Sequence, residues 1–534
     1  MNEVPSDRFD PVARGRRFAG DAYMRADRVI DRGQHHAFRL FWFFLPETSV
    51  ARKPAFQQVM ASRFLSDAGQ QALAFGALIA VVRAGGSAFE AALIGVAAVL
   101  PPALFGLYGG AVADALPKRV ALAAIYNLQA LLCFVVPVAF GTGLFDVIFL
   151  VFAVNVLGQV SGPTESSVIP VVASEEELAS AASLVSLASN LGTAFGTALL
   201  APIIVRVFDA QTVFYVSGVL LLLAATRVFD LSTPEEKRRS MNWRRPNINV
   251  RRTIEWLIHE RAVATMMVVG VLAGTANIVI QTLAPRYVAD VLDVDPANSV
   301  YVFAPSAVGL ALALYLSPKL IRRFAERPVA LTGFIIVTVV LTLLGVVSDE
   351  LADALDPFNP LRVTSVLGIE MAPELRTAGL LAIPLGFGVA LTTTSVQTYL
   401  NRRVPLTFQG RAFALQSVLK NGTAIIPLLT LGGLASVVGV ETVLIFSPML
   451  LLVMAAVLVE LSIALGGRAP TSRLDVLSSF WEESAVPVAN PDEELADSLA
   501  LEAEREDAGE HDGAEDGRDR DALSRAGADE DAPL

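Results

Sequence analysis

Twelve apolar runs, each long enough to cross a bilayer, dominate this 534-residue chain. A membrane-spanning helix needs about 20 mainly apolar residues, because in lipid every backbone polar group must find its hydrogen bond within the segment. Charged residues make up only 18% of the chain, against about a quarter in soluble domains. The sequence therefore predicts an all-α membrane protein with about 12 transmembrane helices.

The runs are arranged as six, a polar break and six more. We expect spans at 57–83, 89–113, 120–140, 145–169, 179–205 and 212–230, and then at 263–289, 298–317, 328–348, 377–400, 410–438 and 441–466. This layout divides the chain into a cytosolic arm with an interfacial aromatic segment (1–56), a first half (57–230), a cytoplasmic linker with an amphipathic helix (231–262), a second half (263–466) and a disordered acidic cytoplasmic tail (467–534).

Sequence echoes between the two sets of six predict two pseudo-symmetric halves. RVALAAI at 119–125 is echoed by PVALTGF at 328–334, and SSVIPVVASEEELASAASL at 166–184 by YLNRRVPLTFQGRAFALQSVL at 399–419. Duplicated halves around a central site are typical of secondary transporters.

Positive charge is unevenly divided between the connections. With the N-terminus in the cytoplasm, the inward connections hold 17 lysines and arginines and the outward ones hold five. Cytoplasmic loops of multi-pass proteins carry this excess. The count predicts that both termini lie in the cytoplasm, and we expect a protein of the plasma (inner) membrane.

The net charge of −12 comes from the tail, where residues 481–534 hold 19 acidic and 4 basic side chains. We expect a small-molecule substrate and membrane lipids as partners, no nucleic acid, a monomer, and a protein partner as one role for the acidic tail. A non-transporting scaffold or sensor that uses this tail is one alternative function.

The sequence contains few of the residue patterns that enzymes use for catalysis. None of the five lysines is followed by Ser or Thr, so the sequence has no G-x-x-x-x-G-K-[ST] phosphate loop. The four histidines all lie outside the expected spans, and Cys133 is the single cysteine. We therefore expect that the protein is not an enzyme and needs no cofactor, and an ATP-driven pump would need its ATPase domain on another chain.

Ionisable side chains inside a span are costly and are candidates for function. Arg63 and Asp67 lie four residues apart on one helical face, where they can pair. We expect Asp67 to be the proton-coupling carboxylate and Glu165, in SGPTESSVIP, to be the second candidate. The alternatives are a structural ion pair for Asp67 and a gating or capping role for Glu165.

Polar side chains scattered over both halves predict a hydrated central cavity. Its expected lining is otherwise apolar, which suits a hydrophobic or amphipathic substrate better than a sugar. The predicted substrate-cavity residues are Arg63, Gln71, Asn155, Gln159, Asn190, Asn277, Gln281 and Gln397.

The stretch between the second and third spans, YGGAVADALPKRVAL, resembles the signature loop of the major facilitator superfamily, G-x-L-A-D-R-x-G-R-K. Ala115 and Pro117 stand where the pattern has its first arginine and its later glycine, and the matching residues are Gly110, Ala113, Asp114, Lys118 and Arg119. The resemblance implies a gating loop in which Asp114 acts as a latch, with Lys118 and Arg119 as its electrostatic partners.

Two further stretches, VRRTIEWLIHER before the seventh span and RRVPLTFQGRAFAL after the tenth, look like the drug- and siderophore-exporter branch, which includes enterobactin exporters and multidrug efflux proteins. Gly192 and Gly196 match the span-five pattern G-P-x-x-G-G of the family's proton antiporters, with Thr193 and Thr197 at the departures. The resemblance implies proton-coupled efflux by alternating access. A lysophospholipid or lipid flippase on the same fold is the second alternative.

Overall fold

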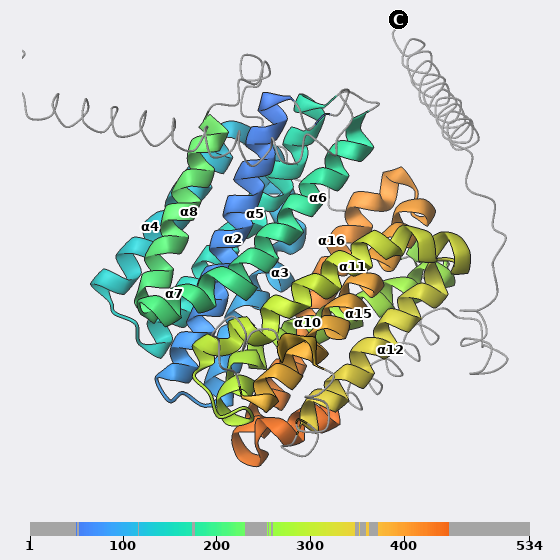
Figure 1. Cartoon of the computed structure of the whole chain (residues 1–534). Helices are drawn as coiled ribbons and strands as arrows, with labels where there is room; N and C mark the ends of the chain where they lie inside the picture. Colours follow the sequence, from blue (N-terminus) through green and yellow to red (C-terminus); the bar gives the residue numbers. More distant parts are fainter. Residues whose placement is uncertain are drawn as a thin grey trace, which may run out of the picture.

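The computed structural model of the chain is a bundle of long helices, and no strand occurs in the parts that it describes (Figure 1). The residues described are 50, 53–115, 117–173, 177–229, 254, 256–257, 260–347, 352, 359–362 and 372–447. Most of the predicted arm, all of its aromatic segment, most of the linker and of the 349–376 connection, and the acidic tail lie outside these residues.

The first half, blue to green in Figure 1, is built from helices that alternate in direction. They are α2 (Pro54–Arg83), α3 (Ala88–Ala115), α4 (Lys118–Ala139), α5 (Leu144–Val172), α6 (Leu178–Ala194), which continues through the π-helix η4 (Phe195–Leu200) into α7 (Ala201–Val207), and α8 (Ala210–Phe229).

The second half, yellow-green to orange, lies beside the first. It contains α10 (Arg261–Asp290), η6 (Pro296–Asn298), α11 (Ser299–Phe324), α12 (Glu326–Gly345), η8 (Pro360–Arg362), α15 (Pro373–Arg403) and α16 (Leu406–Val438), and residues 440–447 are helical. Eleven helices within the described residues are long and apolar enough to cross a membrane. The all-α membrane fold is therefore confirmed, while the twelfth expected span is described only as far as residue 447.

We name the two ends of the bundle by residues that lie there. The Arg83 end carries the connections after α2, α7 and α10, and the Lys118 end carries those after α3 and α11. In the predicted orientation the Arg83 end faces outward and the Lys118 end faces the cytoplasm.

The connection after α3 is shorter than the expected 114–119 loop. The helix continues to Ala115, and α4 begins at Lys118 with Pro117 as its N-cap residue. A proline disfavours helical geometry in the residue before it, which ends α3 close to Pro117. The predicted gating residues Gly110 and Asp114 therefore belong to α3, and Lys118 and Arg119 form the start of α4, so the loop boundaries were wrong.

Helix α2 lies at the centre of the first half and packs closely on α6 and η4. A Cβ atom at Gly192 would lie 2.6 Å from the carbonyl oxygen of Phe64, and one at Gly196 would lie 3.0 Å from the backbone nitrogen of Ala72. Only glycine permits such backbone contact between helices. The two glycines that match the span-five pattern therefore pack closely on α2, and this packing places α6 directly against the charged part of α2.

Three polar contacts join the halves at the Arg83 end. Arg83 Nη2 lies 3.0 Å from Asp295 Oδ2, and Arg286 Nη1 donates to the carbonyl oxygen of Gly86 at 2.7 Å. Arg206, at the end of α7, donates to the Tyr301 hydroxyl and lies over its ring. Opening the bundle at this end would break all three contacts.

Candidate functional site

The principal charged site lies inside the first half, where α2 and α5 meet. Arg63 and Asp67 are one helical turn apart on α2, and Arg63 Nε lies 2.8 Å from Asp67 Oδ2. Glu165 of α5 accepts a hydrogen bond from Nη1 of the same guanidinium. The sequence predicted the first pair, and the fold adds Glu165 to it, so one arginine bridges two carboxylates.

Hydroxyl groups from the surrounding helices complete the site. Tyr126 of α4 donates to Glu165 Oε1, Ser66 Oγ donates to the same oxygen at 3.4 Å, and Arg63 Nη2 donates to Ser189 Oγ of α6 at 3.2 Å. We call these six residues, Arg63, Ser66, Asp67, Tyr126, Glu165 and Ser189, the Arg63 cluster. Four helices of the first half contribute to it.

The cluster is buried well inside the helix ends. Arg63 lies nine residues, about 14 Å, from the first residue of α2. The side chains of Glu165, Asp67 and Arg63 are 4%, 16% and 23% exposed. Burying charge at low dielectric is costly unless the charge is paired, which explains why both carboxylates contact the one arginine.

The cluster contains one cation and two carboxylates. With both acids ionised it carries one net negative charge, and one added proton makes it neutral. Glu165 is held by Arg63, Tyr126 and Ser66, whereas Asp67 Oδ2 has no aligned hydrogen-bond donor despite its 2.8 Å contact with Arg63 Nε. This oxygen of Asp67 is therefore less fully hydrogen-bonded than the carboxylate of Glu165.

The glycine at 192 also shapes the surroundings of Asp67. A Cβ atom there would lie 3.2 Å from Cβ of Asp67, and the π-helix η4 begins three residues later. Single π-helical turns within α-helices occur frequently at functional sites. The span-five glycines thus hold a distorted helix against the proton-binding candidate.

The remaining predicted cavity residues do not form one connected network. Asn155 and Gln159 donate to backbone carbonyls one turn earlier in α5, at 2.8 and 3.0 Å. Gln397 of α15 donates to Gln416 of α16 at 3.2 Å. The others, which are half-buried except for the exposed Asn190, are Gln71, Asn190, Asn277 and Gln281.

The predicted gating residues are only partly described. Gly110 and Asp114 lie in the last turns of α3, and their surroundings lie outside the described side chains. Lys118 Nζ donates to the carbonyl oxygen of Ser167 at 2.7 Å, which ties the start of α4 to the end of α5. Arg119 is half-buried in the first turn of α4. The proposed latch between Asp114 and these cations therefore stays a prediction.

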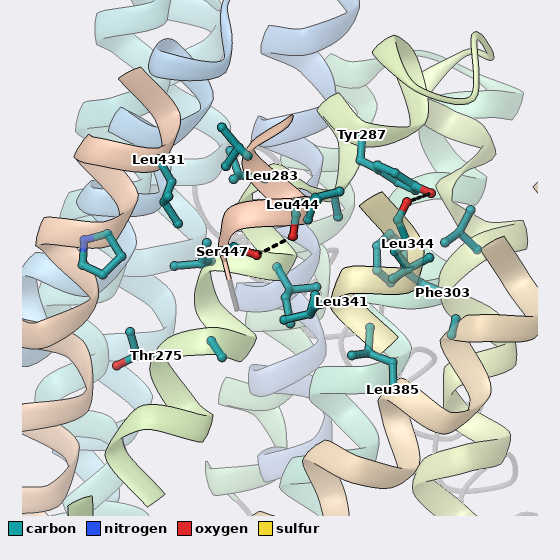
Figure 2. A pocket seen from close by; sticks show the side chains of 18 residues that line it. Thr275, Leu283, Tyr287, Phe303, Leu341, Leu344, Leu385, Leu431, Leu444 and Ser447 are labelled. Atoms are coloured by element: carbon teal, nitrogen blue, oxygen red, sulfur yellow. Dashed lines mark hydrogen bonds between the residues drawn. The ribbon is translucent and has the colours of Figure 1, made fainter. Parts of the chain in front are cut away.

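An apolar cavity of about 60 Å³ lies in the second half, among α10, α11, α12, α15 and α16 (Figure 2). Its lining contains no charged side chain; the polar groups at its edges include Thr275, Tyr287 and Ser447. The Tyr287 hydroxyl donates to the carbonyl oxygen of Leu344 at 3.0 Å. The cavity extends along α10 from its middle toward the Arg83 end.

Sequence reasoning missed several residues near these sites. Tyr126 and Ser189 are neutral and lie on other helices, so nothing in their local sequence links them to Arg63. Lys420 is different, because it is the one lysine deep within an expected span, and an intramembrane charge is itself a signal. In the structure it lies in α16 against α10.

Comparisons with known proteins concern both family and fold. A sequence profile described as Major Facilitator Superfamily matches residues 59–358. A search of curated proteins found no match to this chain.

Among solved structures, the nucleoside transporter NupG is 11% identical over 76% of this chain and 98% of its own, with a TM-score of 0.57. A bacterial homologue of the human lysosomal transporter Spinster, in an inward-facing and unoccupied conformation, is 12% identical over 80% of this chain and 100% of its own, with a TM-score of 0.57. A D-xylose–proton symporter is 12% identical over 77% and 97%, with a TM-score of 0.55. At this identity the likeness is one of fold.

Proposed function

Because the chain belongs to the major facilitator superfamily, and is thus a multi-pass membrane transporter rather than an enzyme, we propose that it exports a small molecule from the cell in exchange for protons. The cargo is hydrophobic or amphipathic, such as a drug or a siderophore. The membrane is the plasma (inner) membrane, with both termini in the cytoplasm, as the distribution of Lys and Arg predicts.

The observation that carries the proposal is the Arg63 cluster. Two carboxylates share one guanidinium at a depth where net charge is expensive. Taking up one proton neutralises the cluster, and releasing it restores a negative charge. Asp67 carries the proton, and Glu165 holds Arg63 in place and is the second site. Because protonation changes the net charge of the cluster, it can change which arrangement of the two halves is more stable.

The alternating step would use the contacts between the halves. The contacts made by Arg83, Arg206 and Arg286 hold the Arg83 end together, and their loss would accompany opening toward the outside. The start of α4, with Lys118 and Arg119, and Asp114 in α3 would gate the opposite end. Both gates act on a central site at mid-depth, where transporters of this architecture bind cargo.

The test is proton-coupled transport by the full chain in inverted membrane vesicles. Wild type should accumulate a fluorescent amphipathic dye when the interior is acidified, and Asp67→Asn should abolish the response to the gradient without lowering expression. Asp146→Asn, which changes an acid on α5 outside the cluster, should transport normally. Unchanged coupling in Asp67→Asn would refute the assignment. Movement of a labelled lysophospholipid without any dye transport would instead favour a flippase.

A further inference from the structure

Lys420 lies at mid-depth in the second half. It is 14 residues, about 21 Å, from the first residue of α16, and the facing Gly274 is 13 residues, about 20 Å, from the first residue of α10. Both positions are far from the ends of their helices. Placing an ammonium group at this depth in a membrane is energetically unfavourable, so Lys420 is a candidate for a functional residue.

The side chain of Lys420 lies in a notch on α10. A Cβ atom at Gly274 would lie 2.6 Å from Cγ of Lys420, and one at Gly270 would lie 2.6 Å from Nε2 of Gln416. The two glycines are four residues apart on α10, and Gln416 and Lys420 are four residues apart on α16. The glycines therefore make room for two long polar side chains, which fixes where the lysine stem runs.

The ammonium group of Lys420 has no counter-ion in the described residues. No hydrogen bond or ion pair to Nζ occurs there, and the acidic residues of the described second-half helices, Asp290, Glu326, Glu374 and Glu441, all lie within two residues of an end of their helix. The carboxylates of the Arg63 cluster are engaged with Arg63. An ammonium group without a counter-ion in the described residues can pair with an anion from outside the protein.

Neutral polar groups continue from the lysine along the same face of α10. Asn277 and Gln281 follow Gly274 at intervals of three and seven residues, which keeps them on one helical face. Both are half-buried, and their amides have no hydrogen-bond partner among the residues described. They can donate to an anionic oxygen or accept from a neighbouring hydroxyl group.

The apolar cavity of Figure 2 begins at Thr275, one residue along α10 from Gly274, and Lys420, Asn277 and Gln281 are not among its lining residues. Thr275, which follows Gly274, lines the cavity, donates to the carbonyl oxygen of Lys420 at 3.2 Å and lies 2.9 Å from the Thr423 hydroxyl. Beyond it the walls are apolar as far as Leu283 and Leu431. Helices α10 and α16 thus carry both the ammonium group of Lys420 and part of the apolar cavity wall.

The first half packs against the same helix, α16. A Cβ atom at Gly106 of α3 would lie 3.1 Å from Val418 of α16 and 3.9 Å from Oε1 of Gln159 on α5. Val418 is two residues from Lys420, and side chains at this spacing point to different faces of a helix, so Val418 of α16 faces α3 while Lys420 faces α10.

We propose that Lys420 binds the anionic group, a carboxylate or a phosphate, of an amphipathic cargo whose apolar part lies in the cavity along α10 and α16. Asn277 and Gln281 hydrogen-bond the same molecule. This inference rests on the proposed transport function and names its substrate class: small amphipathic acids. Charge-assisted hydrogen bonds from an ammonium group to such an anion are about twice as strong as neutral ones.

The test is equilibrium binding to the purified full chain in nanodiscs of neutral phosphatidylcholine, without a proton gradient. The probes are dodecanoate, dodecyl phosphate and the uncharged methyl dodecanoate. Wild type should bind both anions about tenfold more tightly than the ester. Lys420→Met and Lys420→Gln should bind all three at the level of the ester, and Lys420→Arg should keep the preference.

Lys319→Met is the matched control, because Lys319 lies over the Tyr315 ring and donates to its hydroxyl at 3.0 Å, near the end of α11. It should bind as wild type does. The proposal is overturned if wild type shows no preference for the anions, or if the neutral variants that keep wild-type melting temperatures retain it. Inorganic phosphate should not compete, since it lacks the apolar part; competition would mean that the site takes free anions and would overturn the assignment to amphipathic cargo.

Binding and coupling are separate readouts. If dye transport ignores the proton gradient but the anion preference depends on Lys420, the proposed proton exchange fails and the Lys420 site stands. If Asp67→Asn abolishes coupling while Lys420→Met leaves anion preference intact, the Lys420 site fails and the transport proposal stands.

Discussion

The two halves share a helical framework but treat buried charge in opposite ways. In the first half, Arg63, Asp67 and Glu165 satisfy one another across two helices, and hydroxyl groups from two more helices join them. In the second half, the ammonium group of Lys420 has no hydrogen-bond or ion-pair partner within the described residues, and its stem lies against Gly274 of α10. The repeated fold therefore fixes where the helices lie, while the buried polar groups differ with the task of each half.

This difference has a physical reading. A closed set of charges is suited to holding a proton, since its net charge changes by one without any ligand. An open cation is suited to a ligand that brings the missing charge. We therefore assign proton binding to the first half and anion recognition to the second, and each of the following predictions compares the two.

The largest expected effect follows from breaking the paired set. Arg63→Met leaves two buried carboxylates without their cation, which should lower the free energy of unfolding by about 3–5 kcal/mol at pH 7.5. Adding Glu165→Gln should recover part of the loss. Arg402→Met removes an exposed partner of Glu326 and should cost less than about 1 kcal/mol. Unfolding titrations in detergent measure all three, and equal losses in Arg63→Met and Arg402→Met would contradict the pairing described.

A smaller effect is expected at the glycines. Gly192→Ala places a Cβ atom 2.6 Å from a backbone oxygen of α2, so a helix must move, and the loss of stability should be about 1–3 kcal/mol. Gly274→Ala meets the flexible stem of Lys420 and should cost under about 1 kcal/mol while weakening dodecanoate binding. Gly422→Ala, with its nearest atom at 3.9 Å, is the control. A lower melting temperature for Gly274→Ala than for Gly192→Ala would contradict the expectation that the contact at Gly192 is the tighter one.

The local features of this molecule could be predicted from its sequence, and the contacts between distant helices could not. Apolar length predicted twelve spans, eleven of which the described residues contain, and spacing predicted the Arg63–Asp67 pair, because both are properties of single helices. The contact of Arg63 with Glu165 joins residues 102 positions apart, and that with Ser189 joins residues 126 apart. Such contacts depend on how each helix is rotated about its axis and on which helices pack together, and neither can be read from a single sequence.

The predicted gating loop shows the same limit at a boundary. Its charges were found from the sequence, but Asp114 lies within α3, because helix geometry persists to Ala115 before Pro117 intervenes. Lys420 was within reach of sequence reasoning, since an unpaired lysine in an apolar span is conspicuous. Its notch at Gly270 and Gly274 required knowing that α10 faces α16.

The smallest expected effect concerns the contact between the halves at the Arg83 end. Asp295→Asn removes one half-exposed ion pair, worth about 0–1 kcal/mol, and should favour opening at this end without unfolding the protein. In a Cys133→Ala background, a cysteine replacing the buried Ser299 should then react about two- to fivefold faster with a membrane-impermeant maleimide. Asp146→Asn should leave the rate unchanged. An unaltered rate in Asp295→Asn would mean that this pair does not hold the halves together.

The most direct measurement of the division between the halves is infrared difference spectroscopy of the full chain on acidification, which detects the carbonyl stretch of protonated carboxyl groups. Comparing wild type with each variant removes the signal of surface acids. We predict a band that disappears in Asp67→Asn and persists in Lys420→Met and Asp146→Asn. A band unchanged in Asp67→Asn and in the double variant Asp67→Asn/Glu165→Gln would show that the Arg63 cluster does not bind the proton, and would contradict the account.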